Sequence, residues 1–228
     1  MAEAKINTER ISNTLCADCG AQFSGAHFCP ECGKIQPVDE NSDHFSFFGL
    51  PRKLRIDEGE LEKTFYSLSR KFHPDYFMSA SERERQASME RSSKLNDAYR
   101  VLRDKIARIT YLLTLEGYKE AEKKAPSDLL EEVFELNMQI EQLKAAKRIG
   151  EEDDAVDARS SLEDALAGLH EKLAGIDEQL VALSGEWDSA SDTNAAAEMK
   201  SSLLDRMSEM LSHRSYIRHL IGNIQEEL

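Results

Sequence analysis

The sequence has little proline or glycine and no long apolar segment. Only 5 prolines and 11 glycines occur among 228 residues, which excludes a collagen-like chain, a proline-rich linker and a β-sandwich rich in turns. The longest apolar run, around 111–115, is far shorter than the roughly 18–20 residues that a transmembrane helix needs. The first fifteen residues lack the apolar core of a signal peptide and the arginine-rich pattern of a transit peptide. We therefore expect a cytoplasmic, mainly helical protein with no membrane partner.

Basic residues are too few for a nucleic-acid-binding protein. The net charge is −14, whereas phosphate binding requires a cationic face, so we expect no nucleic-acid partner. The charge is also unevenly distributed: residues 1–43 carry a net −4, residues 44–118 a net +3 and residues 119–228 a net −13. A mildly basic middle between acidic flanks indicates separate modules with separate partners.

The four cysteines lie in one short segment and form two Cys-x-x-Cys pairs: Cys16 with Cys19, and Cys29 with Cys32. Each pair places two thiolates on one side of a tight loop, and two such loops can surround one zinc ion with four bonds of roughly 2.3 Å. Gly20 and Gly33 follow the second cysteine of each pair and allow the left-handed backbone that turns the chain past a metal. The spacing therefore predicts a structural Zn²⁺ site.

Two other interpretations of the cysteines are weaker. Disulfides require an oxidising compartment, and the sequence shows no export signal. A redox-active Cys-x-x-Cys pair normally starts a helix in a βαβ pattern, which is missing here. His27 is an alternative ligand, but four cysteines already fill the coordination shell, so we interpret it as a bystander. Because four thiolates leave no open metal position, residues 1–41 are predicted to form an interaction or stability module whose linker starts at Gln36.

Residues 42–118 have the pattern of a helical hairpin. Asp43 and the Gly49-Leu50-Pro51 stop enclose one short helix, and Asp57 precedes a longer one. Pro74 disfavours helical geometry at His73 and ends that helix. Apolar residues recur at helical spacing along the two long helices: Leu61, Phe65, Leu68 and Phe72 on the first, and Ala87, Leu95, Ala98, Tyr99, Leu102 and Ile106 on the second.

This hairpin resembles a J-domain, the module that stimulates the ATPase of DnaK-type chaperones. The loop between the helices begins His73-Pro74-Asp75, and the second helix contains Asn96-Asp97-Ala98-Tyr99-x-x-Leu102. Further motifs, Phe45-x-x-Phe48-Gly49-Leu50 upstream and Arg108-x-x-Tyr111-Leu112-Leu113 downstream, are similar to those of the HscB-type J-proteins of iron–sulfur cluster assembly. The chain departs from that pattern at Lys105 and at Arg108-Ile109, where we expect a smoother turn after the second long helix.

The resemblance implies binding to a DnaK/HscA-type chaperone ATPase. The residues that would contact it are His73, Pro74, Asp75, Lys63, Arg70 and Lys71. The chemistry agrees, because Pro74 restricts the loop, Asp75 can accept charge-assisted bonds from an arginine, and a basic strip can steer an acidic partner. The alternative is a plain helical hairpin with a polar loop and a solvated basic face. No nucleophile or pocket pattern accompanies His73, so we expect no catalytic role and no enzyme.

Residues 119–228 predict an antiparallel three-helix bundle. The first helix is expected to start at the Asp128 cap and to end near Gly150, followed by an acidic connection over 151–157. A second helix is expected to break at 184–188. Heptad-like apolar positions mark the second and third helices: Leu162, Leu166, Leu169, Leu173, Ile176, Leu180 and Leu183, then Leu203, Met207, Met210, Ile217, Ile221, Ile224 and Leu228. Arg214 occupies one seam position of the last helix.

The resemblance implies that this bundle holds an IscU-type iron–sulfur scaffold protein. The residues that match the family's contact positions are Leu130, Phe134, Glu135 and Tyr216. The surplus of apolar residues on the first bundle helix independently predicts that Leu130 and Phe134 are an exposed pair. The alternative is a J-domain protein for a different client, with the bundle acting as a spacer or forming a homodimer. The predicted protein is thus mainly α, with a zinc-knuckle module (1–41), a J-domain hairpin (42–118) and a three-helix bundle (119–228).

Overall fold

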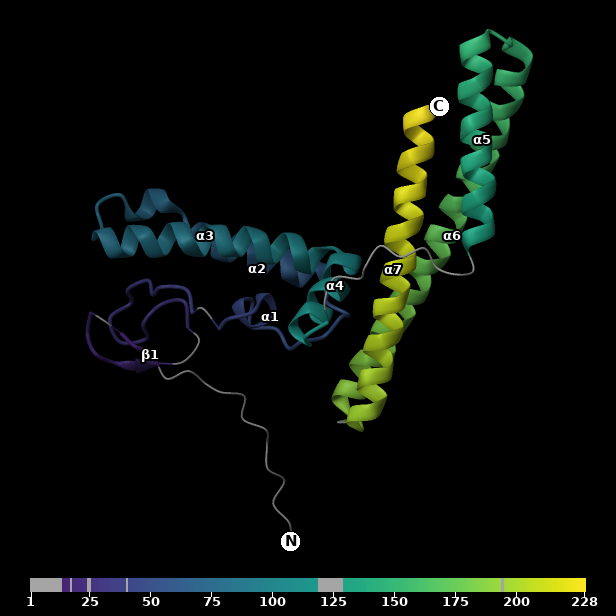
Figure 1. Cartoon of the computed structure of the whole chain (residues 1–228). Helices are drawn as coiled ribbons and strands as arrows, with labels where there is room; N and C mark the ends of the chain where they lie inside the picture. The colour runs from purple at the N-terminus through teal and green to yellow at the C-terminus, as the bar shows by residue number, and fades with distance from the viewer. Residues whose placement is uncertain (1–13, 17, 24–25, 40, 119–128, 194) are drawn as a thin grey trace. The chain divides into compact units, whose positions relative to one another are not determined.

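The computed structural model describes residues 14–16, 18–23, 26–39, 41–118, 129–193 and 195–228 (Figure 1). The chain divides into two compact units, Met1–Asp104 and Lys105–Leu228. The three-module division predicted from the sequence stays a proposal, and the helix that follows Asp104 groups with the C-terminal helices. None of the helices in the described part of the chain combines the length and the apolar composition that crossing a lipid bilayer needs.

The first unit begins with the loops that carry the cysteines. Strands β1 (Thr14–Leu15) and β2 (Gln22–Phe23) pair antiparallel, and an isolated bridge joins Phe28 to Ile35. The first pairing encloses Cys16 and Cys19, and the second encloses Cys29 and Cys32. Each Cys-x-x-Cys pair therefore lies in a compact turn, called a knuckle below.

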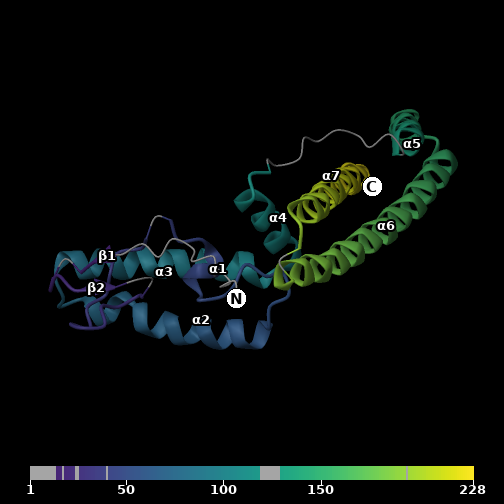
Figure 2. The same ribbon diagram turned by 90° about the horizontal axis from the view of Figure 1, so that it is seen from below.

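The helices of the first unit lie close to their predicted positions. They are α1 (His44–Phe47), α2 (Glu58–Phe72), the 3-10 helix η1 (Pro74–Phe77) and α3 (Glu82–Arg103). Side-chain caps start the three α-helices: Asp43 accepts from the Ser46 amide, Asp57 from the Glu60 amide, and Ser81 forms a capping box with Glu84. Helices α2 and α3 lie side by side (Figure 2) and bury Leu61, Leu68, Phe72, Ala87, Leu95, Ala98 and Leu102.

The cysteine loops pack against these helices. The His27 ring lies 4.9 Å from the ring centroids of both Phe47 and Phe72, and Phe28 lies 5.9 Å from Phe72. Gln36, predicted to start a linker, is buried. The physical reason is that loops with so few apolar residues bury them best against a larger neighbouring core.

The second unit contains the predicted antiparallel three-helix bundle and one additional helix. Its elements are α4 (Lys105–Leu115), α5 (Leu130–Ile149), α6 (Glu152–Asp192) and α7 (Ala197–Glu227). Helices α5, α6 and α7 pack against one another, as Figures 1 and 2 show. Their shared core consists of Leu129, Leu136, Ile140, Leu143, Leu162, Leu169, Ile217, Leu220, Ile221 and Ile224.

Three expectations about helix boundaries were wrong. Ile106 lies on α4, because α3 ends at Arg103 and the backbone of the following residue, Asp104, is extended at ψ 124°. The acidic run from Glu151 forms no long connection, because α6 begins at Glu152; acidic side chains in a first turn are stabilised by the helix dipole. Residues 184–188 do not break α6, which continues to Asp192. The expected Asp128 cap lies outside the described residues.

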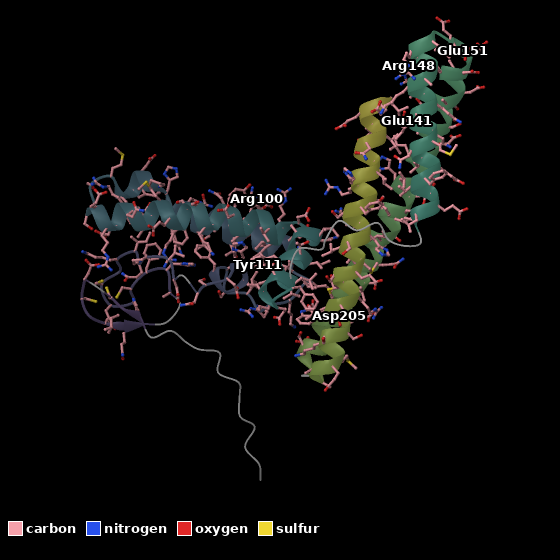
Figure 3. The ribbon with its side chains drawn as sticks, in the orientation of Figure 1. Arg100, Tyr111, Glu141, Arg148, Glu151 and Asp205 are labelled. Carbon is pink, nitrogen blue, oxygen red and sulfur yellow. The ribbon has the colours of Figure 1, made fainter. Side chains whose placement is uncertain are left out.

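The continuity of α6 is explained by burial. Ser184, Trp187 and Asp188 are buried, and the Ser184 hydroxyl donates to the Leu180 carbonyl of its own helix. Packing of these residues outweighs the roughly 1 kcal/mol helix penalty of Gly185. Helix α4 packs against α6 and α7, and the Tyr118 hydroxyl donates to Asp205 Oδ1 at 2.6 Å. Asp205 is labelled in Figure 3. Helices α6 and α7 thus give α4 a surface to pack on.

Candidate metal centre and binding surfaces

The two cysteine knuckles are built alike. The Cys16 amide donates to the Ala21 carbonyl (2.8 Å), and the Cys29 amide donates to the Lys34 carbonyl (2.9 Å). The amides of Gly20 and Gly33 donate back to the carbonyls of Cys16 and Cys29, with φ of 76° and 71° respectively. Left-handed glycines therefore close both turns, as the sequence predicted.

The knuckles bring all four predicted metal ligands together. The Sγ atoms of Cys16, Cys19, Cys29 and Cys32 lie within 4.8 Å of one another. Across the two knuckles, Cys16 Sγ is 3.7 Å from Cys32 Sγ and Cys19 Sγ is 3.6 Å from Cys29 Sγ. A tetrahedron with zinc–sulfur bonds of roughly 2.3 Å has sulfur–sulfur edges of about 3.8 Å. The arrangement therefore fits one tetrahedral, thiophilic metal ion.

The pKa values of neighbouring thiols in this cluster shift in opposite directions. The backbone amide of Cys19 donates to the Cys16 sulfur and lowers the pKa of Cys16 to about 6. The pKa of Cys19 is raised to about 12: the Ala21 amide lowers it, but burial and the neighbouring cysteines oppose a further negative charge more strongly. A bound divalent cation would offset the repulsion between neighbouring thiolates, because cysteines bind a metal in their deprotonated form.

The His73-Pro74-Asp75 loop is exposed at the end of α2. His73 ends the helix, and its Nδ1 accepts the Asp75 amide at 3.3 Å. Pro74 starts η1, and the Tyr76 ring meets the His73 ring edge-on with centroids 6.1 Å apart. Both the imidazole and the Asp75 carboxylate face solvent. The loop thus presents polar groups that local hydrogen bonds orient before any partner arrives.

Two serines of α3 anchor this loop, and sequence reasoning did not identify them. The hydroxyls of Ser88 and Ser92 donate to the Phe72 carbonyl at 2.7 and 3.0 Å. Carbonyls at a helix end have no partner within their own helix, so these bonds satisfy the residue directly before His73. The available signal was the position of Ser88 beside Ala87 on the buried side of α3, where a polar residue requires a partner.

The predicted basic strip lies on the exposed side of α2. Lys63 and Arg70 are exposed; Lys63 Nζ pairs with Glu60 at 2.6 Å, and Arg70 Nε donates to the Tyr66 carbonyl at 3.4 Å. Lys71 is exposed as well, beside the loop. Arg70 and Lys71 therefore lie in the last turn of α2 beside the His73-Pro74-Asp75 loop, whereas Lys63 lies about two turns earlier.

Helix α5 carries an exposed apolar row. Leu130 is 55% exposed and Phe134 65%, and Met138 continues the row one turn later at 49%. Glu131 and Glu135 are exposed along one side of it. The pair predicted from the sequence thus lies outside the core, with its expected acidic rim.

Tyr216 of α7 lies on the other side of this row. It lines a groove of about 240 Å³ with Val133 and Asn137 of α5 and with Ser215, His219, Leu220 and Asn223 of α7. Around a helix of 3.6 residues per turn, Asn137 falls between Val133 and Leu130. Leu130, Phe134 and the Tyr216 groove therefore form one continuous surface, whereas Glu135 lies at its far edge.

Comparison with protein families finds a DnaJ domain over residues 43–111. The chain is 37% identical over 131 residues to the "Iron-sulfur cluster co-chaperone protein HscB homolog" of Arabidopsis thaliana. This alignment covers 57% of this chain and 52% of that protein. It is 30% identical over 151 residues to the human "Iron-sulfur cluster co-chaperone protein HscB", which covers 63% and 64%. The alignments thus span about half to two thirds of the length of these curated relatives.

Solved structures share the fold. The crystal structure of human co-chaperone protein HscB superposes with a TM-score of 0.62 at 23% identity, covering 93% of this chain and 98% of that one. The chaperone HscB from Vibrio cholerae superposes with a TM-score of 0.53 at 25% identity, covering 81% and 96%. The DnaJ-domain match includes the hairpin and its exposed loop, and the structural match to human HscB, at 93% of this chain, extends over the bundle.

Proposed function

Because this chain contains a DnaJ domain and is similar to HscB co-chaperones in sequence and in fold, we propose that it is a co-chaperone of iron–sulfur cluster assembly. It stimulates the ATPase of a DnaK/HscA-type chaperone and delivers an IscU-type scaffold protein to it. The observation that carries the proposal is the exposed His73-Pro74-Asp75 loop, which follows a helix with a basic last turn and lies inside a DnaJ-domain match. The names of the relatives supply the process.

The chaperone binds the end of α2 and its loop. Asp75 accepts a charge-assisted, bidentate hydrogen bond from an arginine of the chaperone, and His73 holds the loop in the conformation that presents this carboxylate. Lys63, Arg70 and Lys71 attract an acidic surface during the approach. No bond is made or broken by these residues, so the chain acts by binding rather than by catalysis.

The scaffold binds the surface formed by Leu130, Phe134 and Tyr216, with Glu135 at its rim. An exposed apolar pair with an acidic border is typical of an interface. Joining this surface and the J-domain in one chain raises the effective concentration of the second encounter, because chaperone and scaffold are then held by the same molecule.

Zinc at the four cysteines is structural in this proposal. Cys16, Cys19, Cys29 and Cys32 would hold the ion, and they fill a four-coordinate shell. Bound zinc supplies cross-linking of two loops that have few apolar residues of their own.

The test uses the full chain, a DnaK/HscA-type chaperone and an IscU-type scaffold. We expect the chain alone to raise steady-state ATP turnover and the scaffold to raise it further only when the chain is present. An unchanged turnover in every mixture contradicts the proposal. If stimulation occurs but the scaffold neither binds nor adds to it, the alternative of a different client gains support, and light scattering then tests whether α5 pairs two copies.

Charge reversal tests the steering role of the basic strip. Replacing both Arg70 and Lys71 by glutamate should lower the association rate constant for the chaperone, because long-range attraction becomes repulsion. Added salt should slow the wild-type association and speed that of the variant, since screening weakens attraction and repulsion alike and the Debye length falls to about 3 Å at 1 M. The measurement is stopped-flow binding at several salt concentrations. Equal rates at every ionic strength would show that the strip is only a solvated face.

A further inference from the structure

Arg91 of α3 lies almost fully buried between the cysteine loops and the end of α2. Its exposed fraction is 5%, and its guanidinium lies 5.8 Å from the centre of the Phe72 ring. Figure 3 shows the side chains that fill the space between α3 and these loops. A buried arginine is uncommon unless its donors are satisfied, so the identity of its partners is informative.

Three groups of the cysteine loops satisfy Arg91. Its Nε donates to the Gln36 carbonyl (2.5 Å), its Nη2 to the Pro37 carbonyl (2.8 Å) and its Nη1 to His27 Nδ1 (2.5 Å). These partners are neutral, and burial lowers the pKa of Arg91 to about 10. The guanidinium is therefore a buried cation whose stability depends on acceptors that the cysteine loops supply.

His27 has a defined role in this junction. A guanidinium can only donate hydrogen bonds, so Nδ1 of His27 must be the unprotonated acceptor. The His27 ring also packs against Phe47 and Phe72. It is thus neither a metal ligand nor a bystander, but the contact that joins the cysteine loops to the aromatic residues of α1 and α2.

The segment of α3 that contains Arg91 also binds Phe72, the residue directly before the exposed loop. Ser88 and Ser92 bind the Phe72 carbonyl, while Arg91 between them binds the cysteine loops and borders the Phe72 ring. His73 follows directly in the chain. One segment, Ser88–Ser92, therefore connects the metal-binding loops to the start of the His73-Pro74-Asp75 loop.

We propose that Arg91 is a positioning residue that couples metal binding at the four cysteines to the conformation of Phe72–Asp75. The loops have little apolar core, so without metal their fold, and with it the acceptor positions of Gln36, Pro37 and His27, is lost. A buried cation without acceptors is strongly unfavourable, so Arg91 leaves its site and the packing on Phe72 loosens. By linkage, removing Arg91 weakens metal binding in return.

Any effect of this coupling on the chaperone rests on the proposed function, but the coupling itself does not.

Hydrogen exchange on the full chain measures the coupling between metal binding and residues 70–76 directly. Removing Zn²⁺ with a chelator should accelerate exchange of the amides at residues 70–76 on the order of tenfold, while amides near the middle of α7 keep their rates. In Arg91→Met the exchange at 70–76 should already be fast with Zn²⁺ bound and should not respond to the chelator. Competition with a chromogenic chelator should show a Zn²⁺ affinity on the order of tenfold lower.

The matched control is Arg100→Met, on the exposed side of the same helix (Figure 3). This arginine pairs with Asp97 of its own helix. It should leave both exchange and affinity unchanged. Arg91→Lys, which retains the charge but loses the fork of donors, provides a second variant in case Arg91→Met unfolds. Release of Zn²⁺ from the wild type without any change at residues 70–76 overturns the proposal. ATPase stimulation measured on the same samples separates the two ideas: coupling without stimulation contradicts only the proposed function, and stimulation without coupling contradicts only this inference.

Discussion

The His73→Gln variant should lose nearly all stimulation of the chaperone ATPase while folding normally. The imidazole is exposed, so its replacement removes little buried area and should change the free energy of unfolding by about 0.5 kcal/mol or less. Its Nδ1 accepts the Asp75 amide, and this bond orients the carboxylate that meets the chaperone. Loss of a preorganised contact of this kind costs about 2 kcal/mol or more of binding, or roughly thirtyfold in affinity.

The measurement is steady-state ATP turnover against the concentration of the chain, together with a thermal melt. His170→Gln is the control, because this histidine is also exposed but lies on α6. Full stimulation by a folded His73→Gln protein would exclude the J-domain loop as the chaperone contact. A lowered melting temperature in His73→Gln alone would instead show that the loop contributes to the stability of the fold.

The second large effect is expected at the client surface. Leu130→Ala combined with Phe134→Ala should weaken scaffold binding at least about tenfold, because truncating an anchoring aromatic residue typically costs about 2 kcal/mol or more. Both side chains are more than half exposed, so the bundle core keeps its contacts and the protein should stay folded. Basal stimulation of the chaperone by the J-domain should survive, since no residue of that site has changed.

Ile149→Ala with Val156→Ala is the matched control, because these two residues are 65% and 64% exposed at the α5–α6 turn. Titration calorimetry with the scaffold compares both double variants with the wild type. Normal binding by the Leu130/Phe134 variant would place the client elsewhere and favour the dimer or spacer alternative. Equal weakening in both pairs would indicate a general loss of apolar surface rather than a site.

Local signals determined the features that depend on only a few neighbouring residues. Pro74 ends α2 at His73 because its ring restricts the backbone of the preceding residue. Gly20 and Gly33 close the cysteine turns for a similarly local reason. Helical periodicity separated Leu136 and Ile140, which are buried, from Leu130 and Phe134, which are exposed.

The same local signals failed where a penalty was offset by distant contacts. The Gly185 region was expected to break a helix, but burial of Trp187 and its neighbours keeps α6 continuous. The acidic run after Gly150 was expected to be a connection, but its charges stabilise the start of that helix. Propensity is a weak term beside packing, and packing is not visible in a window of ten residues.

By itself, the sequence determined the four-cysteine cluster, the exposed loop and the exposed pair Leu130 and Phe134, because each follows from short-range spacing along the chain. Only the tertiary structure decided the role of Arg91 and His27. Arg91 meets the Gln36 carbonyl across a separation of 55 residues and His27 across 64. A basic residue on a helix is usually solvated, and nothing local distinguishes it from one that is buried. Whether such a residue is buried depends on whether another part of the chain supplies acceptors at that position, since a buried cation persists only where its donors are satisfied.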